Sequence, residues 1–355
     1  MTTTTDDRLR SALDALLDGL PPRQLSGAVE RLMTHYRGRT PTGAPILRDR
    51  ADVVAYAAYR MPATTSAVSA ALGELAARLP GWSPASQLDV GGGTGAAVWA
   101  VAGVWPGERH VTVLDWAGPA LELGRELADG GAGPRGTAWE KERLGPGLEL
   151  PAAELVTISY VLNELTEEAR DAVVDAAAAT GGAVVLVEPG TPDGYLRMRR
   201  ARDRLTGAGM RVLAPCPHSG ACPLEPGADW CHFAARVSRS SLHRRVKGGE
   251  LPYEDEKFSY VAAVPAGWET PGAAPGRIVR RPQQRKGQVL LDVCEPAGEV
   301  RRATVTKRTK DAYRAARDAE WGDTWPPAPD AAAPATPPGT AAPGGPAAGD
   351  AGAPE

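Results

Sequence analysis

The stretch Leu88-Asp89-Val90-Gly91-Gly92-Gly93-Thr94-Gly95 decides the fold of this chain. An apolar run ends in an acid, a glycine loop follows, and an Ala- and Val-rich run over residues 96–104 comes next. This order predicts a strand, a tight turn and a helix. Glycines allow the backbone to approach a ligand closely, and the N–H groups that open the next helix point into the same space. The stretch therefore predicts a ligand site at the start of an α/β domain.

A glycine-rich loop alone also occurs as a structural turn in other α/β domains, so the residues around it matter. Asp89 stands two residues before the first loop glycine, in the pattern Asp-x-Gly-x-Gly-x-Gly, whereas dinucleotide-binding loops have Gly-x-Gly-x-x-Gly. A second strand-like run, over residues 110–114, ends in Asp115. An acid at this position accepts hydrogen bonds from the two hydroxyls of a ribose.

These residues resemble the cofactor site of class I S-adenosylmethionine-dependent methyltransferases. The resemblance implies that S-adenosylmethionine binds at Asp89, Gly91, Gly93, Gly95 and Asp115. From residue 83 to about residue 205 the sequence alternates between strand-like and helical runs, as in a doubly wound sheet. We therefore predict an α/β fold with a class I methyltransferase, Rossmann-like sheet.

Two later strands of this sheet are predicted at residues 155–160 and 183–187. Ligands of open α/β sheets bind at the carboxyl ends of the strands, so we expect Tyr160, Asn163 and Glu188 to line the pocket. The sequence has no Asn-Pro-Pro-Tyr or Asp-Pro-Pro-Tyr run there, the arrangement that grips an exocyclic amine in many nucleic-acid methyltransferases. We therefore assign no catalytic residue.

The length of 355 residues predicts about two domains and allows a large core. Residues 1–80 are predicted to form a helical N-terminal region, in which Pro62 should break or restart a helix. The cofactor domain is expected over residues 81–206, and a basic α+β module that carries the cysteines over residues 207–325. In residues 326–355, 25 of 30 are Pro, Ala or Gly, which predicts a disordered tail.

The formal net charge is −3, so a nucleic-acid-binding surface would have to be local. The opening Met-Thr-Thr-Thr-Thr-Asp-Asp lacks the charged start and apolar stretch of a signal peptide, and it carries acids, which transit peptides avoid. No run approaches the ~18 apolar residues that a membrane span needs. These features predict a cytoplasmic protein with no membrane partner.

All four cysteines lie beyond residue 215, at Cys216, Cys222, Cys231 and Cys294. The first three cluster in loops rich in Pro and Gly, and a cytoplasmic location disfavours disulfides. We therefore predict a shared metal centre, with structural thiols as the alternative. Zinc sites usually pair cysteines two to four residues apart, which these are not, whereas four thiolates suit a [4Fe–4S] cluster. His218 and His232 keep a mixed Cys/His zinc site as the second possibility.

Basic residues are concentrated after residue 196. A predicted helix carries five arginines within residues 197–204, and residues 277–319 hold twelve Lys or Arg against five Asp or Glu. Such a local excess in an acidic chain indicates a nucleic-acid surface. Because aromatic residues are sparse in it, contacts to phosphates and to shape are favoured over base stacking. We predict RNA binding at Arg197, Arg200, Arg244, Arg245, Arg280, Arg281, Arg285 and Lys286.

A family resemblance covers roughly residues 48–323. Besides the glycine loop, it is carried by Tyr59-Arg60-Met61-Pro62-Ala63-Thr64, Pro215-Cys216-Pro217-His218 through Cys222, Asp229-Trp230-Cys231-His232-Phe233, Tyr253-Glu254-Asp255-Glu256-Lys257-Phe258-Ser259-Tyr260 and Trp321-Gly322-Asp323. These segments resemble the Rsm-type methyltransferase-like proteins of the small ribosomal subunit, known from mitochondria and bacteria. The resemblance implies a class I methyltransferase fold, a [4Fe–4S] cluster on the four cysteines, and association with small-subunit ribosomal RNA during assembly.

Two classes of function follow. In the first, the protein is an S-adenosylmethionine-dependent RNA methyltransferase that acts in ribosome assembly and translation. In the second, it is a non-catalytic small-subunit assembly factor with a structural cofactor pocket and a [4Fe–4S] cluster. The intact glycine loop favours cofactor binding, while the missing catalytic motif favours the second class. A small-molecule methyltransferase would leave the basic module without a purpose.

Overall fold

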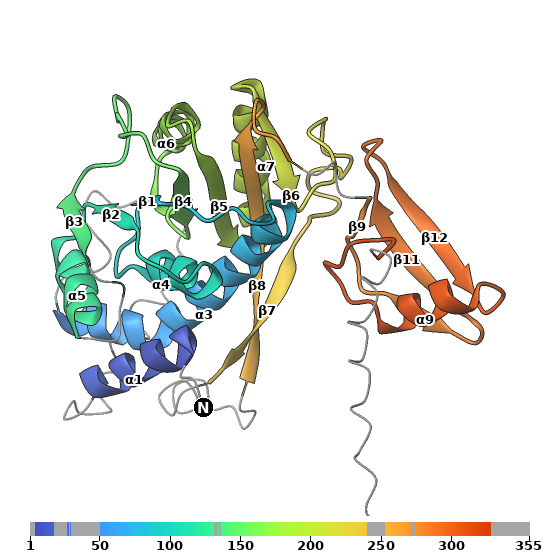
Figure 1. Cartoon of the computed structure of the whole chain (residues 1–355), viewed down its shortest axis with the longest axis horizontal. Coiled ribbons are helices and arrows are strands. Elements are labelled where there is room, and N and C mark those ends of the chain that lie inside the picture. The colour runs from blue at the N-terminus through green and yellow to red at the C-terminus, as the bar shows by residue number, and fades with distance from the viewer. Residues whose placement is uncertain are drawn as a thin grey trace, which may run out of the picture.

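The computed structural model describes residues 4–17, 27, 29, 50–130, 134, 136–239, 253–270 and 275–327. These residues form a large α/β body and a smaller β-sheet with one helix beside it (Figure 1). Within the described ranges, no helix is long and apolar enough to cross a membrane. The predicted RNA-binding residues Arg244 and Arg245, and the predicted tail beyond residue 327, lie outside the described residues.

The main sheet has eight strands: β1 (Ser86–Val90), β2 (His110–Asp115), β3 (Thr137–Lys141), β4 (Leu155–Ser159), β5 (Ala183–Pro189), β6 (Met210–Ala214), β7 (Phe233–Ser238) and β8 (Tyr253–Pro265). Their order is β3-β2-β1-β4-β5-β8-β6, and β7 also pairs with β8. The first five strands run parallel, and β8 runs antiparallel to its neighbours β5, β6 and β7. The class I methyltransferase, Rossmann-like fold predicted from the sequence is therefore confirmed.

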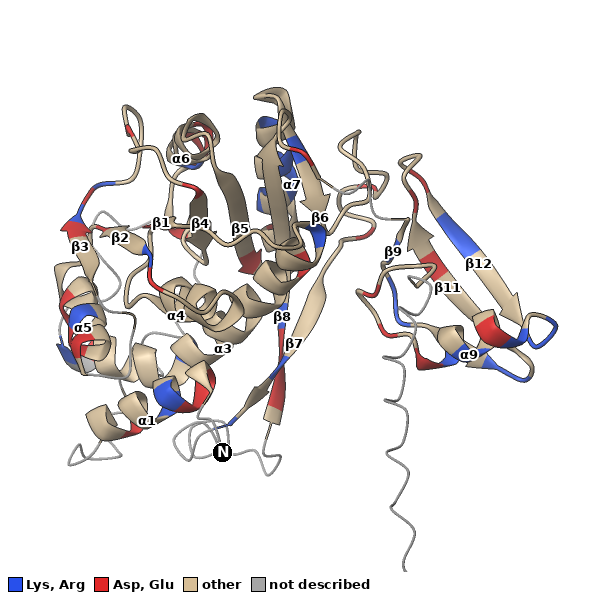
Figure 2. Cartoon of the chain, in the orientation of Figure 1, with Lys and Arg blue, Asp and Glu red and all other residues tan. Residues whose placement is uncertain are grey.

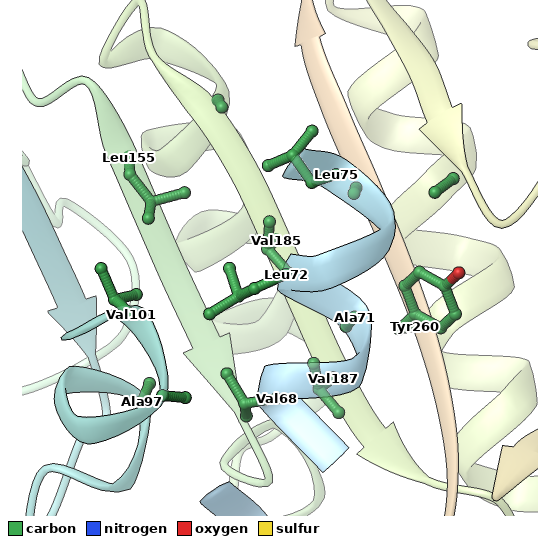
Figure 3. Close-up of a cluster of buried hydrophobic side chains, with 14 of the residues drawn as sticks. Val68, Ala71, Leu72, Leu75, Ala97, Val101, Leu155, Val185, Val187 and Tyr260 are labelled. Atoms are coloured by element: carbon green, nitrogen blue, oxygen red, sulfur yellow. The ribbon is translucent and has the colours of Figure 1, made fainter. Parts of the chain in front are cut away.

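Helices cover both faces of this sheet: α3 (Arg50–Arg78), α4 (Ala96–Val104), α5 (Gly118–Asp129), α6 (Glu167–Ala179) and α7 (Pro192–Gly207). Helix α1 (Thr5–Leu17) packs on this helical layer. On one face, Val68 and Leu72 of α3 pack against β5, as Figure 3 shows. On the other face, residues of α6 and α7 join the opposite side of β4 and β5. This double cover explains why β5 is a continuous apolar run rather than an alternating one.

The prediction that Pro62 breaks or restarts a helix is wrong, because α3 runs without interruption from Arg50 to Arg78. Proline removes one backbone hydrogen bond from a helix interior and would normally end or kink it. Here Ala58, Met61 and Ala63 around it are all buried in the core, so tertiary packing offsets the lost bond.

The smaller sheet consists of β9 (Arg277–Ile278), β10 (Gln283–Arg285), β11 (Gln288–Cys294) and β12 (Val300–Thr306), and α9 (Lys310–Asp318) packs on it. Its core contains Ile278, Val289 and Leu291, which are completely buried. Residues 207–325, which were predicted to form one module, contribute strands to both sheets. Strands β6, β7 and β8 belong to the main sheet, because the run Val261 to Val264 is buried on both faces, and only the part from Arg277 onward forms a second sheet.

Candidate functional site

The glycine loop lies at the point where the order of the main sheet reverses. Strand β1 has β2 on one side and β4 on the other, so the loops that follow β1 and β4 face the same crevice. Gly91 and Gly92 donate backbone hydrogen bonds to the carbonyl of Leu114 at 2.7 and 3.2 Å, which folds the loop over the end of β2. Gly93 has a φ of +54°, in the left-handed region that favours glycine.

Asp115, at the end of β2, organises this loop. Its Oδ2 accepts a hydrogen bond from the Gly93 amide at 2.9 Å, and its Oδ1 accepts one from the Ala117 amide at 2.8 Å. Burial raises the pKa of this carboxyl group, while the backbone amides act in the opposite direction. Asp115 is 8% exposed, so it lies at the edge of the crevice, where the sequence predicts a ribose-binding acid.

Asp89 lies beneath the loop instead of facing the crevice. It is completely buried, and its Oδ1 accepts a hydrogen bond from the Thr157 hydroxyl at 2.8 Å. Its Oδ2 is buried without a hydrogen-bond partner among the described atoms, and burial raises the pKa of Asp89 to about 7. A Cβ at Gly92 would collide with this Oδ2 and come within 2.7 Å of Val113. Sequence reasoning missed Gly92, whose lack of a side chain is required by packing.

Close packing also explains why two of the predicted cofactor-binding positions in the loop are glycines. A Cβ at Gly91 would come within 2.6 Å of Val161, and a Cβ at Gly95 would come within 2.7 Å of the Trp139 ring. By contrast, a Cβ at Gly93 would meet only Asp115 Oδ2, at 3.8 Å. Gly93 is therefore the loop position beside open space, and the place where a ligand could approach the backbone.

Helix α3 and the end of β4 form the rim of this crevice. The Thr94 hydroxyl contacts Met61 Sδ at 3.5 Å. Tyr160, directly after β4, has a φ of +56° and is the one non-glycine residue in the described part of the chain with a positive φ. Its hydroxyl lies 3.0 Å from Glu256, which forms two hydrogen bonds with Arg60, and the Arg60 guanidinium lies 5.6 Å from the centre of the Tyr160 ring.

The sequence did not link Arg60 and Glu256 to this rim, although both lie in runs that carried the family resemblance. Glu188, which was expected to line the pocket, is completely buried. It pairs with Arg197 at 2.6 Å and accepts a hydrogen bond from the Leu162 amide at 3.1 Å. Asn163 lies in the short 3-10 helix η1 (Leu162–Glu164) and is half-buried.

The four cysteines surround a single cavity of about 50 Å³. They come from the loop after β6, the segment before β7 and the end of β11: Cys216, Cys222, Cys231 and Cys294. Burial raises the pKa of the Cys294 thiol to about 12 and that of the Cys231 thiol well above its usual value. Within the described residues, no group of three or more His, Cys, Asp or Glu side chains is arranged so that it could hold a metal ion.

Polar side chains in the cavity wall touch the cysteines. The Tyr195 hydroxyl lies 3.4 Å from Cys222 Sγ, and His218 Nε2 lies 3.5 Å from Cys294 Sγ. Arg202, which is 5% exposed, donates to the carbonyls of His218 and Gly220 at 3.0 and 2.6 Å, while its Nε has no partner in the described structure.

A second buried arginine, Arg277, is 1% exposed and also lines the cavity. It donates to the carbonyl of Pro215 at 3.1 Å and pairs with Glu74 of α3 at 2.6 Å. The C-terminal sheet is therefore tied both to the cysteine loop and to the helix that borders the glycine loop.

Three of the six described residues that were predicted to bind RNA have acidic partners. Arg197 pairs with Glu188, Arg200 pairs with Asp171 and Glu167 of α6, and Arg280 pairs with Asp229. The arginines of α7 therefore bind neighbouring parts of the protein, which sequence reasoning could not see because the acids lie about 30 or more positions away or on another element. Arg281, Arg285 and Lys286 are exposed, with no acidic partner in the described part of the chain.

Known proteins resemble this chain at several levels. The human protein named ribosome assembly protein METTL17, mitochondrial, is 31% identical over 294 residues, covering 76% of this chain and 62% of the human one. Ribosome assembly protein RSM22, mitochondrial, of Saccharomyces cerevisiae is 23% identical over 246 residues, covering 41% of this chain and 39% of the yeast one. This chain therefore spans less than two thirds of the length of these relatives. Because both relatives are named as mitochondrial, the cytoplasmic location stays a prediction.

Among solved structures, a putative RNA methyltransferase from Pyrococcus horikoshii superposes with a TM-score of 0.38 at 10% identity, over 68% of this chain and 97% of that one. The family described as mitochondrial small ribosomal subunit Rsm22 matches residues 50–326, which hold both the glycine loop and the cysteine cavity. The chain belongs to the Rsm22 family.

Proposed function

We propose that this protein is an S-adenosylmethionine-dependent methyltransferase-like protein that binds small-subunit ribosomal RNA during ribosome assembly, and that it carries a [4Fe–4S] cluster. The observation that carries the proposal is that three cysteines clustered in sequence and the distant Cys294 line one cavity, in an Rsm22-family chain whose glycine loop is intact. The names of its relatives support the assembly role, and the family description supports the small subunit.

The residues of the crevice fit S-adenosylmethionine. Asp115 stands at the edge of the crevice, where ribose hydroxyls could donate to its carboxylate. Gly93 leaves open space beside the backbone, which a side chain would occupy. When bound, this cofactor supplies an electrophilic methyl group. Asp89 supports binding indirectly, since it lies under the loop and fills the space against Gly92.

The residues of the cavity fit an anionic cluster. Four thiolates give a [4Fe–4S] site a net negative charge, and Arg202 and Arg277 place two nearly buried positive charges in the cavity wall. Glu74 balances the charge of Arg277. Among the described residues, the only acid that pairs with Arg202 is Asp203, at 3.4 Å, and that side chain is 56% exposed. A buried guanidinium without a close buried acid favours an anionic occupant of the cavity.

The number and the spacing of the cysteines favour a cluster over zinc. Four cysteines line the cavity, the number of ligands that a [4Fe–4S] cluster has, and they do not show the close pairing that zinc sites usually have.

Anaerobic purification with iron, sulfide and zinc analysis tests the cluster. We expect about four irons per chain, because the cluster has four cysteine ligands. A colourless protein with stoichiometric zinc would refute this part of the proposal and leave the cofactor part standing.

Calorimetry with S-adenosylmethionine tests the cofactor site. Asp115→Ala should weaken binding by roughly ten- to a hundredfold, because it removes a hydrogen-bonding carboxylate. Asp129→Ala is the matched control, since Asp129 is an exposed acid at the end of the neighbouring helix α5. If the wild-type protein bound no cofactor at millimolar concentration, the cofactor part would be wrong.

A further inference from the structure

The two ends of the small C-terminal sheet differ in how their basic residues are balanced. At the end near the cysteine cavity, Arg301 of β12 pairs with Glu295 at 2.6 Å, and Arg302 pairs with Asp292 at 2.7 Å. Both stand opposite the last residues of β11, because the register places Arg301 beside Val293. Positive charge at this end is therefore neutralised within the protein.

The far end of the same sheet carries basic residues without acidic partners. Two turns meet there, since the Lys307 amide donates to the Gly287 carbonyl at 3.1 Å. One turn carries Arg285 and Lys286, and the other carries Lys307 and Arg308; all four are exposed. Figure 2 shows this basic end of β12 pointing away from the α/β body. In the described structure, none of the four has an ion pair.

Lys310, at the start of α9, adds a fifth exposed positive charge to this end. The acid nearest to it in sequence, Asp311, is itself only 3.7 Å from Arg314. We define the far-end cluster as Arg285, Lys286, Lys307, Arg308 and Lys310. Like charges gathered on one surface repel each other, so the cluster is most stable beside a polyanion.

We propose that the far-end cluster is the surface through which this protein contacts the phosphate backbone of structured ribosomal RNA. This inference rests on the proposed RNA-binding function and assigns a surface to it. Unpaired exposed cations release counterions when phosphates neutralise them, whereas paired ones must first give up an intramolecular partner. No aromatic side chain belongs to the cluster, so contacts to phosphates are favoured over stacking on single-stranded bases.

The far-end cluster differs from the set of RNA-binding residues that the sequence predicted. Arg197, Arg200 and Arg280 leave the proposed surface because each has a carboxylate partner. Lys307, Arg308 and Lys310 enter it, because the hairpin register brings their turn beside Gly287. The cluster is also at the opposite end of β11 from Cys294, so the [4Fe–4S] site would support the sheet without touching the RNA.

The test compares two variants of the full-length protein. The first replaces Arg285, Lys286, Lys307 and Arg308 by Gln, and the matched control replaces the paired Arg301 and Arg302 by Gln. Binding to a small-subunit rRNA transcript and to a short RNA duplex is measured between about 50 and 200 mM salt. Iron content and thermal melting of both variants verify that the sheet is intact.

We expect the four-residue variant to lose at least about tenfold in affinity at low salt, and its salt slope to flatten by roughly three to four, about one for each phosphate that the variant no longer neutralises. The control should retain its slope within about one. Equal losses in both variants, or an unchanged four-residue variant, would overturn the assignment. So would competition by polyglutamate as effective as that by the duplex, since an acidic protein would then be the better partner. A wild-type protein that bound no RNA would instead refute the proposed function.

Discussion

At the glycine loop, the decisive hydrogen bond joins residues 22 positions apart, Gly93 and Asp115, whereas in the cysteine cavity His218 meets Cys294 across 76 positions. The loop is built from one strand–turn–helix unit and the end of the next strand. The cavity is built from α7, two loops and the last strand of a separate sheet. The first site is centred on that local unit, with added packing from Val161 and a hydrogen bond between Thr157 and Asp89, while the second combines elements that are far apart in the sequence. We therefore expect substitutions at the two sites to affect the rest of the protein to different extents.

The largest effect is expected from removing a cluster ligand. Cys222→Ser or Cys294→Ser should reduce the iron content from about four per chain to nearly none, because the cluster needs four thiolates. Since metal-binding energy contributes to folding where no preformed site exists, the C-terminal sheet should also lose its cooperative melting transition. Metal analysis and circular dichroism would show both losses.

The same cysteine variants sharpen the comparison at the glycine loop. If the loop depends only on its local unit, S-adenosylmethionine should bind these variants about as tightly as it binds the wild type. Loss of cofactor binding would mean that the two sites are linked, and the Arg277–Glu74 pair between the C-terminal sheet and α3 would be the contact to examine.

A smaller effect is expected from two arginines on the same helix. Arg202→Gln removes charged hydrogen bonds to the carbonyls of His218 and Gly220, which should reduce the free energy of unfolding by about 3 kcal/mol and shorten the lifetime of the cluster in air. Arg204→Gln removes surface pairs with Asp171 and Asp175 and should cost less than about 1 kcal/mol. Urea unfolding measures both; equal costs would show that Arg202 has no special role at the cavity.

The sequence predicted those features that depend on neighbouring residues, and it did not predict contacts between residues far apart in the chain. Strands β1, β2, β4 and β5 were predicted, because each apolar run is followed by its own turn or helix signal. For the same reason the sequence placed the glycine loop after β1 and Asp115 at the end of β2, whereas their role as a cofactor site stays a prediction. The acids that pair with Arg197 and Arg200 lie on other elements, and the bridge between the turns at Gly287 and Lys307 depends on hairpin register. No sequence window contains that information.

Within the glycine loop, two neighbouring substitutions should separate packing from ligand binding. Gly92→Ala places a methyl group against Asp89 and Val113 and should cost about 1–3 kcal/mol of stability. Gly93→Ala has open space but a φ of +54°, so it should cost about 1–2 kcal/mol and weaken S-adenosylmethionine binding more than its neighbour does. Thermal melts and calorimetry measure the two effects. A larger binding defect in Gly92→Ala would contradict the position assigned to the ligand.

The last effect concerns the pH dependence of stability. Burial raises the pKa of Asp89 to about 7 in the folded protein, from 3.8 when unperturbed. Between these values the unfolded chain has lost the proton that the folded protein still holds, so the contribution of Asp89 to stability falls as the pH rises. The slope is at most about 1.4 kcal/mol per pH unit, and it disappears below the lower pKa and above the upper one.

Asp89→Asn should remove this dependence, because the amide oxygen can still accept from the Thr157 hydroxyl but does not titrate. In cofactor-free protein, the variant should therefore gain stability relative to the wild type between pH 5 and 8. The comparison uses urea midpoints at the two pH values, with Asp129→Asn as an exposed control that should show no such change. The same difference at both pH values would mean that Asp89 stays ionised in the folded protein. The loop would then hold a buried charge beneath Gly92, as the cavity does at Arg202.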